Sequence, residues 1–523
     1  MNKFKSNKLV FKNEKNIFLL SIILSSLIIK IIFIPTDFPV KLDAIDYFSF
    51  GIELSKTWTF PIGILNTNDG WSIFLSPIFS IIGYSDFMNL IYSQRLTSVI
   101  LSSLTIIPIY LLCRQFTSSN FSLIGVSIFA FHPMIIENSI LGISESLYIF
   151  LISVTLYSIF SKNNKLLYSS FFLTSFLSIV RYEGLILFIP LTIVFFLRFT
   201  NSKKNFLKFP ILIGISLLII LSIGNLRSSD NGIDGFQSHL FSDLSFLNCS
   251  INCLTDANES EYEIMNSKNF LNSSIFNTIK FLAWVSIPFY LILIPLGIVQ
   301  LVKTQRKDFV YLILFAFFLL VPALYAYGRE LSEIRYLFVL FPIFSVFTSN
   351  FFTFNTKFEN SKWILLIILI IFSFSIFFLN SYLDDYEYER EIYVVTKFLI
   401  NNGNGSNNYP GNEYVKVATL ESLWPNPLPL KETGRTDYYF KKIPYDEYKT
   451  LEDFLKNSRE KGLTHLIILK NNEVDFLNPI FYNYSNYPYL IKVFDSDDLN
   501  FKNKILIFKI DYEIFNELNY KIT

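Results

Sequence analysis

Two aspartates, Asp43 and Asp46, stand about one helical turn apart directly after the first long apolar run, in the stretch LDAIDYFSFGIEL. If residues 43–54 are helical, the period of about 3.6 residues places both carboxylates on one face together with Glu53. The opposite face is apolar and carries Ile45, Phe48 and Ile52. This pattern predicts an amphipathic helix at the bilayer surface whose carboxylates point away from lipid, where they could carry chemistry. The plainer interpretation is a polar face that any interfacial helix needs.

Further ionisable residues fall where other apolar runs begin or end. They comprise Arg95, His132, Glu145, Arg181, Glu183, Arg329, Glu330, Glu333 and Arg335. Each of them alone is compatible with a side chain that snorkels at the end of a membrane span. Their combination with the two aspartates on one side of the membrane predicts a site in which carboxylates lie beside guanidinium groups, which suit phosphate.

The composition indicates which elements must hold these residues. Of the 523 residues, 52% are hydrophobic and 18% aromatic, including 58 Phe, whereas 17% are charged. A soluble protein of this length carries more charge and less Phe, so the recurring apolar runs predict a multi-span membrane protein. The formal net charge of +1 creates no field that would favour nucleic acid or an acidic partner.

About eleven apolar runs are candidates for membrane spans. They cover residues 17–35, 94–113, 121–137, 143–160, 166–180, 184–199, 208–226, 279–302, 309–327, 335–353 and 362–380. Lys and Arg gather before the first run and in alternate turns, for example at Lys3, Lys5, Arg198 and Lys203. By the positive-inside rule these turns are cytoplasmic. We therefore expect a multi-pass protein of the cell membrane with a cytoplasmic N-terminus and an extracytoplasmic tail after Asn380.

The chain divides by composition into two regions. Residues 1–380 are the expected transmembrane region, with a first outer loop at 36–93 and a large acidic outer loop at 227–275. Residues 381–523 hold short β-rich runs, VKVATL, THLIIL, YLIKVF and KILIFKI, with a helix-like stretch between the first two. Strand and helix in alternation predict a small α/β domain. The expected fold is thus mainly α and polytopic, with a C-terminal extracytoplasmic α/β domain.

The cysteines suggest no metal centre. Cys113 lies at a cytoplasmic membrane edge and is interpreted as a packing residue. Cys249 and Cys253 lie in the outer loop, where a short disulfide is an open alternative. Two thiols with the distant His239 make an incomplete ligand set for a metal ion.

Several motifs follow one another in order along most of residues 15–350. They are D-A-I-D-Y, N-D-G-W-x-x-F-L-S-P, Q-R-L-T-S-V, H-P with G-I-S-E-S-L, R-Y-E-G and R-Y-L-F-V-L-F-P. With this order the chain resembles the GT-C superfamily of membrane glycosyltransferases, particularly the branch of protein O-mannosyltransferases and lipid A aminoarabinose transferases. In style its outer domain resembles archaeal members. In one departure, many relatives carry adjacent Asp-Glu where this chain reads Asp43-Ala44-Ile45-Asp46, so both aspartates stay candidates for the catalytic carboxylate.

The resemblance implies a hexose donor linked through phosphate to a polyprenyl or dolichyl chain in the membrane lipid. An acceptor hydroxyl, on a protein or a glycan, would attack the anomeric carbon with inversion. Asp43 would be the base that activates this hydroxyl, with Asp46 as its partner or substitute. The leaving phosphate has a second pKa near about 6 and needs no strong general acid. The residues expected to bind the lipid phosphate, or to orient those that do, are Arg181, Arg329, Arg335, Glu145, Glu183, Arg95 and His132.

Other functions stay open at this point. A divalent cation held by Asp43 and Asp46 is an alternative that the wider superfamily offers, although the branches named above generally use none. A transporter or a flippase for lipid-linked glycans would place polar residues in the middle of its spans, whereas the charged groups here lie at span ends. A non-catalytic assembly subunit would keep the acids only as a polar face. The sequence does not identify the sugar or the acceptor.

Overall fold

A computed structural model describes residues 13–40, 43–61, 68–84, 86–200, 206–231, 267–303, 307–354, 360–381, 386–387, 389–391, 393–395, 398, 416–418, 441–442, 448–460, 463–470 and 476–520. The centre of the expected acidic loop, with Cys249 and Cys253, lies outside these ranges, as do Lys3 and Lys5. Contacts divide the chain into two compact units, one of Met1–Ile34 with Leu42–Asn380 and one of Pro35–Lys41 with Ser381–Thr523.

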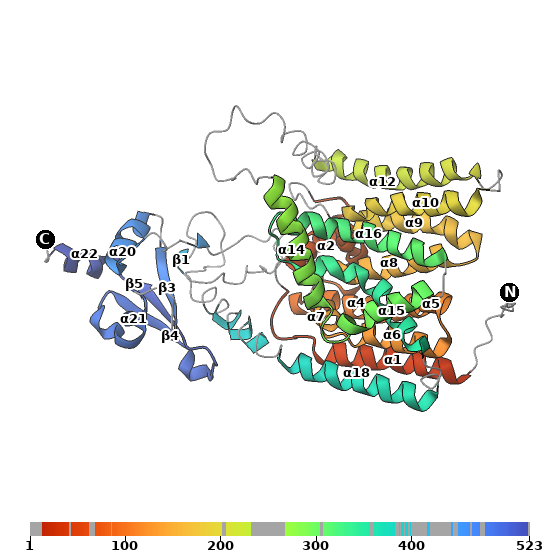
Figure 1. The fold of residues 1–523 in the computed structure, drawn as a ribbon. Coiled ribbons are helices and arrows are strands. Elements are labelled where there is room, and N and C mark those ends of the chain that lie inside the picture. The colour runs from red at the N-terminus through yellow and green to blue at the C-terminus, as the bar shows by residue number, and fades with distance from the viewer. Residues whose placement is uncertain are drawn as a thin grey trace. The chain divides into compact units, whose positions relative to one another are not determined.

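The first unit is built of helices (Figure 1). Its α-helices are α1 Asn13–Ile32, α2 Asp43–Thr57, α3 Gly70–Ile82, α4 Phe87–Leu104, α5 Ile106–Phe116, α6 Ser119–Ala130, α7 Pro133–Ile140, α8 Glu145–Phe160, α9 Asn164–Val180, α10 Phe188–Phe199, α12 Phe209–Asn231, α14 Ser267–Val285, α15 Tyr290–Lys303, α16 Lys307–Gly328, α17 Phe341–Phe351 and α18 Ser361–Ser381. Short 3₁₀ helices adjoin α10 and α17: η1 Tyr182–Leu187, η2 Ile334–Leu340 and η3 Phe352–Phe354. Among the closest packed pairs are α2 with α3, α8 with α9, and α15 with α17.

Six helices of the described residues are long and apolar enough to cross a membrane, or up to eight if two bent pairs each form one span. The six are Phe87–Phe116, Tyr182–Phe199, Phe209–Arg227, Asp308–Gly328, Ile334–Phe354 and Lys362–Asn380. The runs expected at 17–35 and 143–160 form shorter apolar helices, Asn16–Ile32 and Glu145–Phe160. The mainly helical, polytopic fold is confirmed, with fewer full-length spans in these residues than the sequence pattern predicts.

The span expected at 121–137 is broken in two. Helices α6 and α7 meet at 53°, and the intervening His132 has φ −68° and ψ 124°, an extended conformation. Pro133 explains the break, because a proline disfavours the helical conformation in the residue before it and readily begins a new helix.

The helix α2 forms where the sequence predicts it, but its apolar face is covered differently. Ile45, Phe48 and Ile52 are 3%, 2% and 0% exposed, so protein covers the face that was expected to meet lipid. The ring of Phe48 lies 5.5 Å from that of Phe79, on the neighbouring helix α3. The expectation of a helix lying apolar side down on the bilayer is therefore wrong, because α3 supplies the apolar partner.

The second unit contains a five-stranded sheet in the order β2-β1-β3-β5-β4. The strands are β1 Lys416–Ala418, β2 Lys441–Lys442, β3 Leu463–Leu469, β4 Leu490–Asp495 and β5 Ile505–Ile510, and the helices α20 Leu451–Glu460, α21 Asn478–Asn483 and α22 Tyr512–Tyr520. Strand β1 is parallel to β2 and β3, whereas β5 is antiparallel to β3 and β4. Leu455 of α20, Leu466 of β3 and Phe508 of β5 belong to one buried core. The predicted C-terminal α/β fold is confirmed.

The short segment before α2 belongs to this second unit. Phe38 is 2% exposed and packs in a cluster with Val395, Ile467 and Ile505. The N-terminal part of the chain thus contributes an apolar side chain to the core of the C-terminal unit.

Helices of the first unit approach closely where one of them carries a glycine. A Cβ added at Gly297 of α15 would lie 2.0 Å from the carbonyl oxygen of Phe347 on α17. A Cβ added at Gly214 of α12 would meet no atom within 4 Å. Because lipid gives little hydrophobic drive for helices to associate, close packing at small residues holds such helices together.

Gly297→Ala is expected to lower the thermal midpoint of the detergent-solubilised protein, because the added methyl must push two helix backbones apart at a cost of about 1–3 kcal/mol. Gly214→Ala is the matched control and should leave the midpoint unchanged or raise it, since alanine favours a helix over glycine by up to about 1 kcal/mol. Thermal scanning of both variants makes the comparison. Equal midpoints would contradict the close approach of α15 and α17.

Candidate active site

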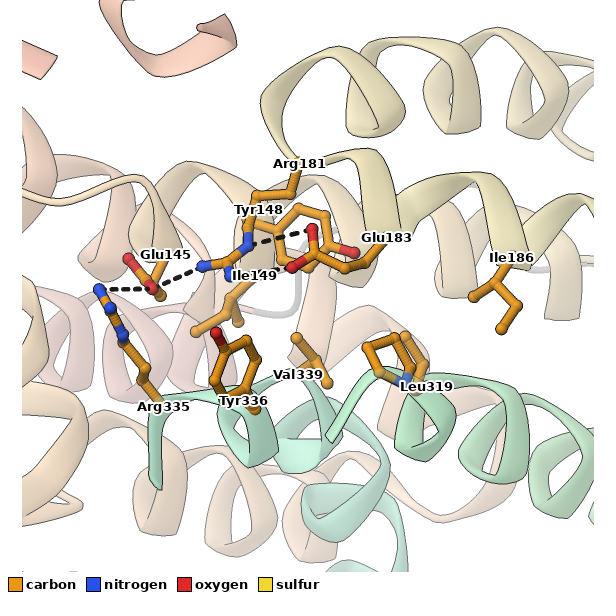
Figure 2. A pocket seen from close by; sticks show the side chains of 11 residues that line it. Glu145, Tyr148, Ile149, Arg181, Glu183, Ile186, Leu319, Arg335, Tyr336 and Val339 are labelled. Atoms are coloured by element: carbon orange, nitrogen blue, oxygen red, sulfur yellow. Dashed lines mark hydrogen bonds and ion pairs between the residues drawn. The ribbon is translucent and has the colours of Figure 1, made fainter. Parts of the chain in front are cut away.

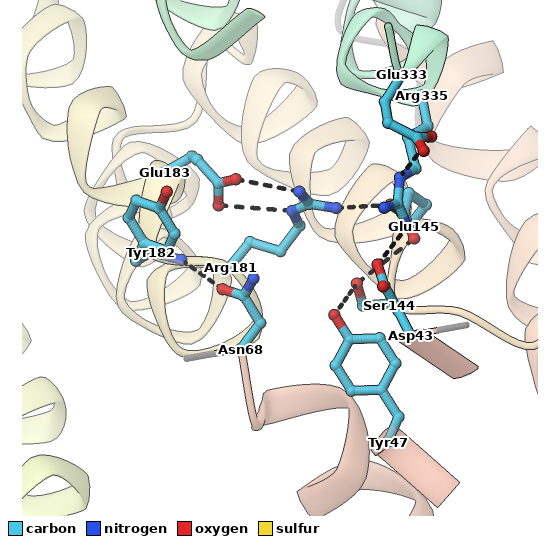
Figure 3. A network of polar contacts seen from close by, with 10 residues as sticks. All are labelled: Asp43, Tyr47, Asn68, Ser144, Glu145, Arg181, Tyr182, Glu183, Glu333 and Arg335. Atoms are coloured by element: carbon cyan, nitrogen blue, oxygen red, sulfur yellow. Dashed lines mark hydrogen bonds and ion pairs between the residues drawn. The ribbon is translucent and has the colours of Figure 1, made fainter. Parts of the chain in front are cut away.

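Separate segments of the first unit bring ionisable side chains to one place (Figure 3). Asp43 is the first residue of α2, and Glu145 is the first residue of α8. Arg181 and Glu183 lie at the turn from α9 to η1, and Arg335 lies in η2. The structure thus brings together these predicted site residues, each near an end of an apolar helix, where charged groups are tolerated in a membrane protein.

The carboxylate of Glu145 is shared by two arginines. Its Oε1 lies 2.6 Å from Nη1 of Arg181 and 3.5 Å from Nη1 of Arg335. Arg181 also donates from Nη2 to Oε1 of Glu183 at 3.1 Å, and Nη1 of Arg335 lies 2.7 Å from Oδ2 of Asp43. The result is a chain of alternating charges in which each guanidinium group lies between carboxylates.

This network runs from the protein interior to an exposed edge. The side chains of Arg181 and Glu145 are 10% and 4% exposed, whereas that of Asp43 is 46% exposed. At the exposed edge Arg335 also contacts Glu333, with 3.3 Å between Nε and Oε2. A small anion could therefore reach Arg335 from outside, while Arg181 behind it is held by buried carboxylates.

The two helix starts favour negative charge. Asp43 and Glu145 both occupy first turns, of α2 and α8. The unsatisfied backbone N–H groups and the helix dipole stabilise an anion at such a position by about 0.3–1 kcal/mol. The hydroxyl of Ser144 lies 3.5 Å from Oε2 of Glu145 and 3.4 Å from the hydroxyl of Tyr47, which extends the polar contacts toward α2.

A pocket opens beside Arg181 (Figure 2). Its enclosed part is small, about 20 Å³, which is room for about one water molecule. The charged network forms one wall, and apolar side chains that include Ile149, Leu319 and Val339 form the other. The guanidinium of Arg181 lies 5.7 Å from the ring centroid of Tyr148 and 5.6 Å from that of Tyr336. Charged and apolar side chains therefore meet beside Arg181.

Asp46 has an altered proton affinity. Partial burial, and then the negative charge of Asp43, raise the pKa of Asp46 above its usual range. Burial also raises the pKa of the neighbouring Tyr47 to about 12, with a further contribution from Glu145. A carboxyl group with a raised pKa accepts a proton more readily than an ordinary aspartate, which suits a general base.

The network contacts given above for the described residues do not involve three other predicted residues. Arg329 follows α16, is exposed, and lies over the ring of Tyr325 at 5.7 Å. Arg95 is 3% exposed within α4. His132 is fully buried, and its ring stacks on that of Tyr290 at 5.4 Å between centroids. The ring of His132 thus packs among aromatic rings at the break between α6 and α7.

Some residues of the site carry no role in the sequence interpretation. They are Tyr148 and Tyr336, which flank Arg181. Helical spacing could have indicated Tyr148, since it stands three residues after Glu145 and shares its face. No local signal indicates that Tyr336 faces Arg181, because that contact joins segments far apart in the sequence.

Asp43, Glu145 and Glu183 are each paired with an arginine. In the part of the chain that the structure describes, no group of three or more His, Cys, Asp or Glu side chains is placed to hold a metal ion. A divalent cation at Asp43 and Asp46 stays a hypothesis.

No protein-family model matches the sequence, and no curated protein does. Among solved structures, the chain is similar to an oligosaccharyltransferase of Archaeoglobus fulgidus in complex with Zn and sulfate, with a TM-score of 0.48 and 12% identity over 86% of this chain and 67% of that one. It is also similar to archaeal AglB of that organism in complex with an inhibitory peptide and a dolichol-phosphate, with a TM-score of 0.47 and 12% identity over 87% and 69%. A third is ArnT from Cupriavidus metallidurans, with a TM-score of 0.46 and 7% identity over 94% and 97%.

Likenesses at this level say nothing about the chemistry of this site. We therefore base the function on the side chains described above.

Replacing Glu145 by Gln should destabilise the protein, because two guanidinium groups then lose their shared carboxylate. Removing one partner of a buried ion pair costs about 3–5 kcal/mol. Glu333→Gln is the matched control, since Glu333 contacts the same network but its side chain is 52% exposed, and it should cost less than about 1 kcal/mol. Thermal unfolding in detergent measures both variants. A similar loss in both would show that sharing of Glu145 does not stabilise the site.

Proposed function

We propose that the chain is an inverting glycosyltransferase of the cell membrane. It moves a hexose from a polyprenyl- or dolichyl-phosphate donor to an acceptor hydroxyl, on a protein or a glycan, at the outer membrane face. One observation carries the proposal: the helix that bears Asp43 and Asp46 contacts Arg335, which is linked through Glu145 to Arg181. Candidate bases and guanidinium groups suited to phosphate thus belong to one site.

The phosphate of the donor fits Arg335. Its side chain is 22% exposed, and its planar donor groups match phosphate oxygens in pairs. Phosphate would share this guanidinium with Asp43, because the five N–H donors of an arginine can serve more than one anion. Arg181 adds a second positive charge behind it. The polyprenyl chain then continues along the apolar wall of the pocket into the membrane.

The reaction is a displacement at the anomeric carbon. The acceptor oxygen forms the new glycosidic bond as the bond between the anomeric carbon and the phosphate oxygen breaks, and polyprenyl phosphate leaves. The proton of the acceptor passes to a carboxylate, because a hydroxyl is a poor nucleophile at neutral pH. Arg335 and Arg181 stabilise the negative charge on the leaving phosphate.

The positions of the two aspartates support a division of roles. An inverting displacement needs the base and the leaving phosphate on opposite sides of the anomeric carbon. Asp43 contacts Arg335 at 2.7 Å and so stands on the phosphate side. Asp46 follows one turn later on α2, with Cβ atoms about 5–6 Å apart. We therefore assign Asp46 as the base and Asp43 as the residue that orients Arg335, the reverse of the assignment implied by the sequence resemblance.

The orientation in the membrane is part of the proposal. The distribution of Lys and Arg in the sequence favours a cytoplasmic N-terminus and an extracytoplasmic C-terminal region, residues 381–523. The donor would then enter from the outer leaflet. No described residue of the second unit belongs to the network. This unit is proposed to position the acceptor.

Asp46→Asn is expected to lower hexose transfer by at least about 100-fold, the contribution of a general base. Asp43→Asn should lower it less and mainly raise KM for the donor. The measurement uses proteoliposomes supplied with radiolabelled polyprenyl-phosphate hexoses and a mixture of peptides and glycans. Asp86→Asn is the control, because Asp86 caps α4 through Met88 N and asparagine caps a helix equally well.

Loss of transfer in Asp43→Asn with transfer retained in Asp46→Asn would return the role of base to Asp43. If wild type consumes no donor, the chain is not such an enzyme, and transport of lipid-linked glycans becomes the next function to test.

The pH dependence tests the base directly. The base must be ionised, so kcat/KM should fall as pH drops through the raised pKa of Asp46. Asp43→Asn removes one of the two causes of that rise, the neighbouring negative charge, so Asp46 ionises more easily. The acid limb of residual activity, measured between about pH 4 and pH 8, should therefore shift to lower pH in this variant. An unshifted limb would count against Asp46.

A further inference from the structure

The motif N-D-G-W, followed by Ser72, has no role in the chemistry above, yet it lies deep in the first unit. Residues 68–72 lead into α3. Asp69, Trp71 and Ser72 are 2%, 0% and 0% exposed. Buried polar groups need hydrogen-bond partners. The sequence does not indicate where these partners are. In the structure several of them lie on the segments that carry the charged network.

Asn68 supplies a hydrogen-bond acceptor to the segment that begins with Arg181. Its Oδ1 accepts from the backbone N–H of Tyr182 at 3.3 Å (Figure 3). Tyr182 is the first residue of η1, where backbone N–H groups lack partners within the helix. The residue at the N-cap is Arg181, whose side chain cannot accept a hydrogen bond. Asn68 therefore caps η1 from a distant segment, and the guanidinium of Arg181 serves the network instead.

Gly70 and Asp69 fix the start of α3 against two other segments. A Cβ added at Gly70 would lie 2.5 Å from Cα and 2.6 Å from N of Val180, the residue before Arg181. Only a glycine allows this approach of two backbones. Asp69 is paired with Arg227 of α12, with 3.0 Å between Oδ2 and Nε and with both side chains nearly buried. The start of α3 is thus fixed against α12 and against the turn that carries Arg181.

Trp71 and Ser72 reach the other segments of the network. Nε1 of Trp71 donates to the carbonyl oxygen of Gly142 at 2.9 Å. Gly142 has φ +78°, a conformation that favours glycine, and it stands three residues before Glu145. The hydroxyl of Ser72 donates to the carbonyl oxygen of Tyr47 on α2 at 2.9 Å. Side chains within five consecutive residues therefore bond to the backbones that lead to or carry the charged side chains.

We propose that residues 68–72 are a positioning unit that holds Arg181, Glu145 and α2 in register for binding the phosphate of the donor. The identity of that ligand rests on the proposed function. Because one short segment bonds to three others, a displacement of any of them is passed to the rest. The unit acts through Arg181 and Glu145 and is not proposed to recognise the sugar.

Asn68→Ala and Trp71→Phe each remove one hydrogen bond of the unit. Each should raise KM for the polyprenyl-phosphate hexose about tenfold, the worth of one such bond, with kcat changed by less than about twofold. Asn68→Asp keeps an oxygen acceptor for Tyr182 and should restore KM to near the wild-type value. Asn350→Ala is the matched control, because Asn350 is also buried and its Nδ2 bonds to Val346 in its own helix.

A double-mutant cycle separates positioning from a general loss of stability. In an Arg181→Lys background, Asn68→Ala should raise KM by less than about twofold, because the group that it positions has already been altered. Thermal midpoints measured without donor should likewise be non-additive for Asn68→Ala with Arg181→Lys, and additive for Asn350→Ala with Arg181→Lys.

Additive midpoints for the first pair, or an equal rise of KM in Asn350→Ala, would overturn the positioning unit. Non-additive midpoints in a protein that consumes no donor would support the unit and reject the proposed function. The two proposals therefore fail in different ways.

Discussion

The carboxylate of Glu145 lies between the guanidinium groups of Arg181 and Arg335, and the arrangement of the site follows from this contact. A buried carboxylate must be paired to remain charged at acceptable cost. Its partners come from segments far apart in the sequence, so pairing them requires the turn after α9 and the helix η2 to meet at the start of α8. Of the two arginines, Arg335 stands at the exposed edge and is therefore the one that a ligand meets first.

These ion pairs also require that the backbone segments carrying them are held in fixed relative positions. Gln94 of α4 donates from Nε2 to the carbonyl oxygens of both Ala44 and Gly142, at 2.9 and 2.7 Å. One amide thus joins the start of α2 to the loop before Glu145. Together with the contacts of residues 68–72, these buried hydrogen bonds set the positions of the charged groups relative to one another. Such bonds are costly to break, because the freed groups would stay unsatisfied away from water.

The low overall charge of the chain explains where the chemistry can be. Apolar helices tolerate ionisable groups at their ends, so the site forms where several ends meet. The packing of α3 against the apolar face of α2 also matters for the site. A helix resting on lipid would let Asp43 and Asp46 move relative to Arg335, whereas a helix packed on protein holds them in place. Holding the base and the phosphate-binding group close together in the right geometry can supply a large part of the lowering of the activation barrier.

The sequence by itself determined the class of the protein and the position of its main elements. Apolar runs, the 3.6-residue period after Asp43 and the β-rich runs of the C-terminal region predicted a polytopic helical protein with a small α/β fold, because these are local patterns. It also indicated that Glu145, Arg181 and Arg335 stand near helix ends. Arg95, expected at the start of a span, instead lies inside Phe87–Phe116. The two-residue strand β2, Lys441–Lys442, carries no such pattern and was not predicted.

The tertiary structure decided which of these residues meet. Arg181, Arg335 and Glu145 join in one network, whereas Arg329 remains exposed beside Tyr325 and His132 packs among aromatic rings. A periodic pattern says which face a side chain shares with its helical neighbours. It does not say which other helix covers that face, since this depends on how all the helices pack, and the pairings of a charged site are made between helices.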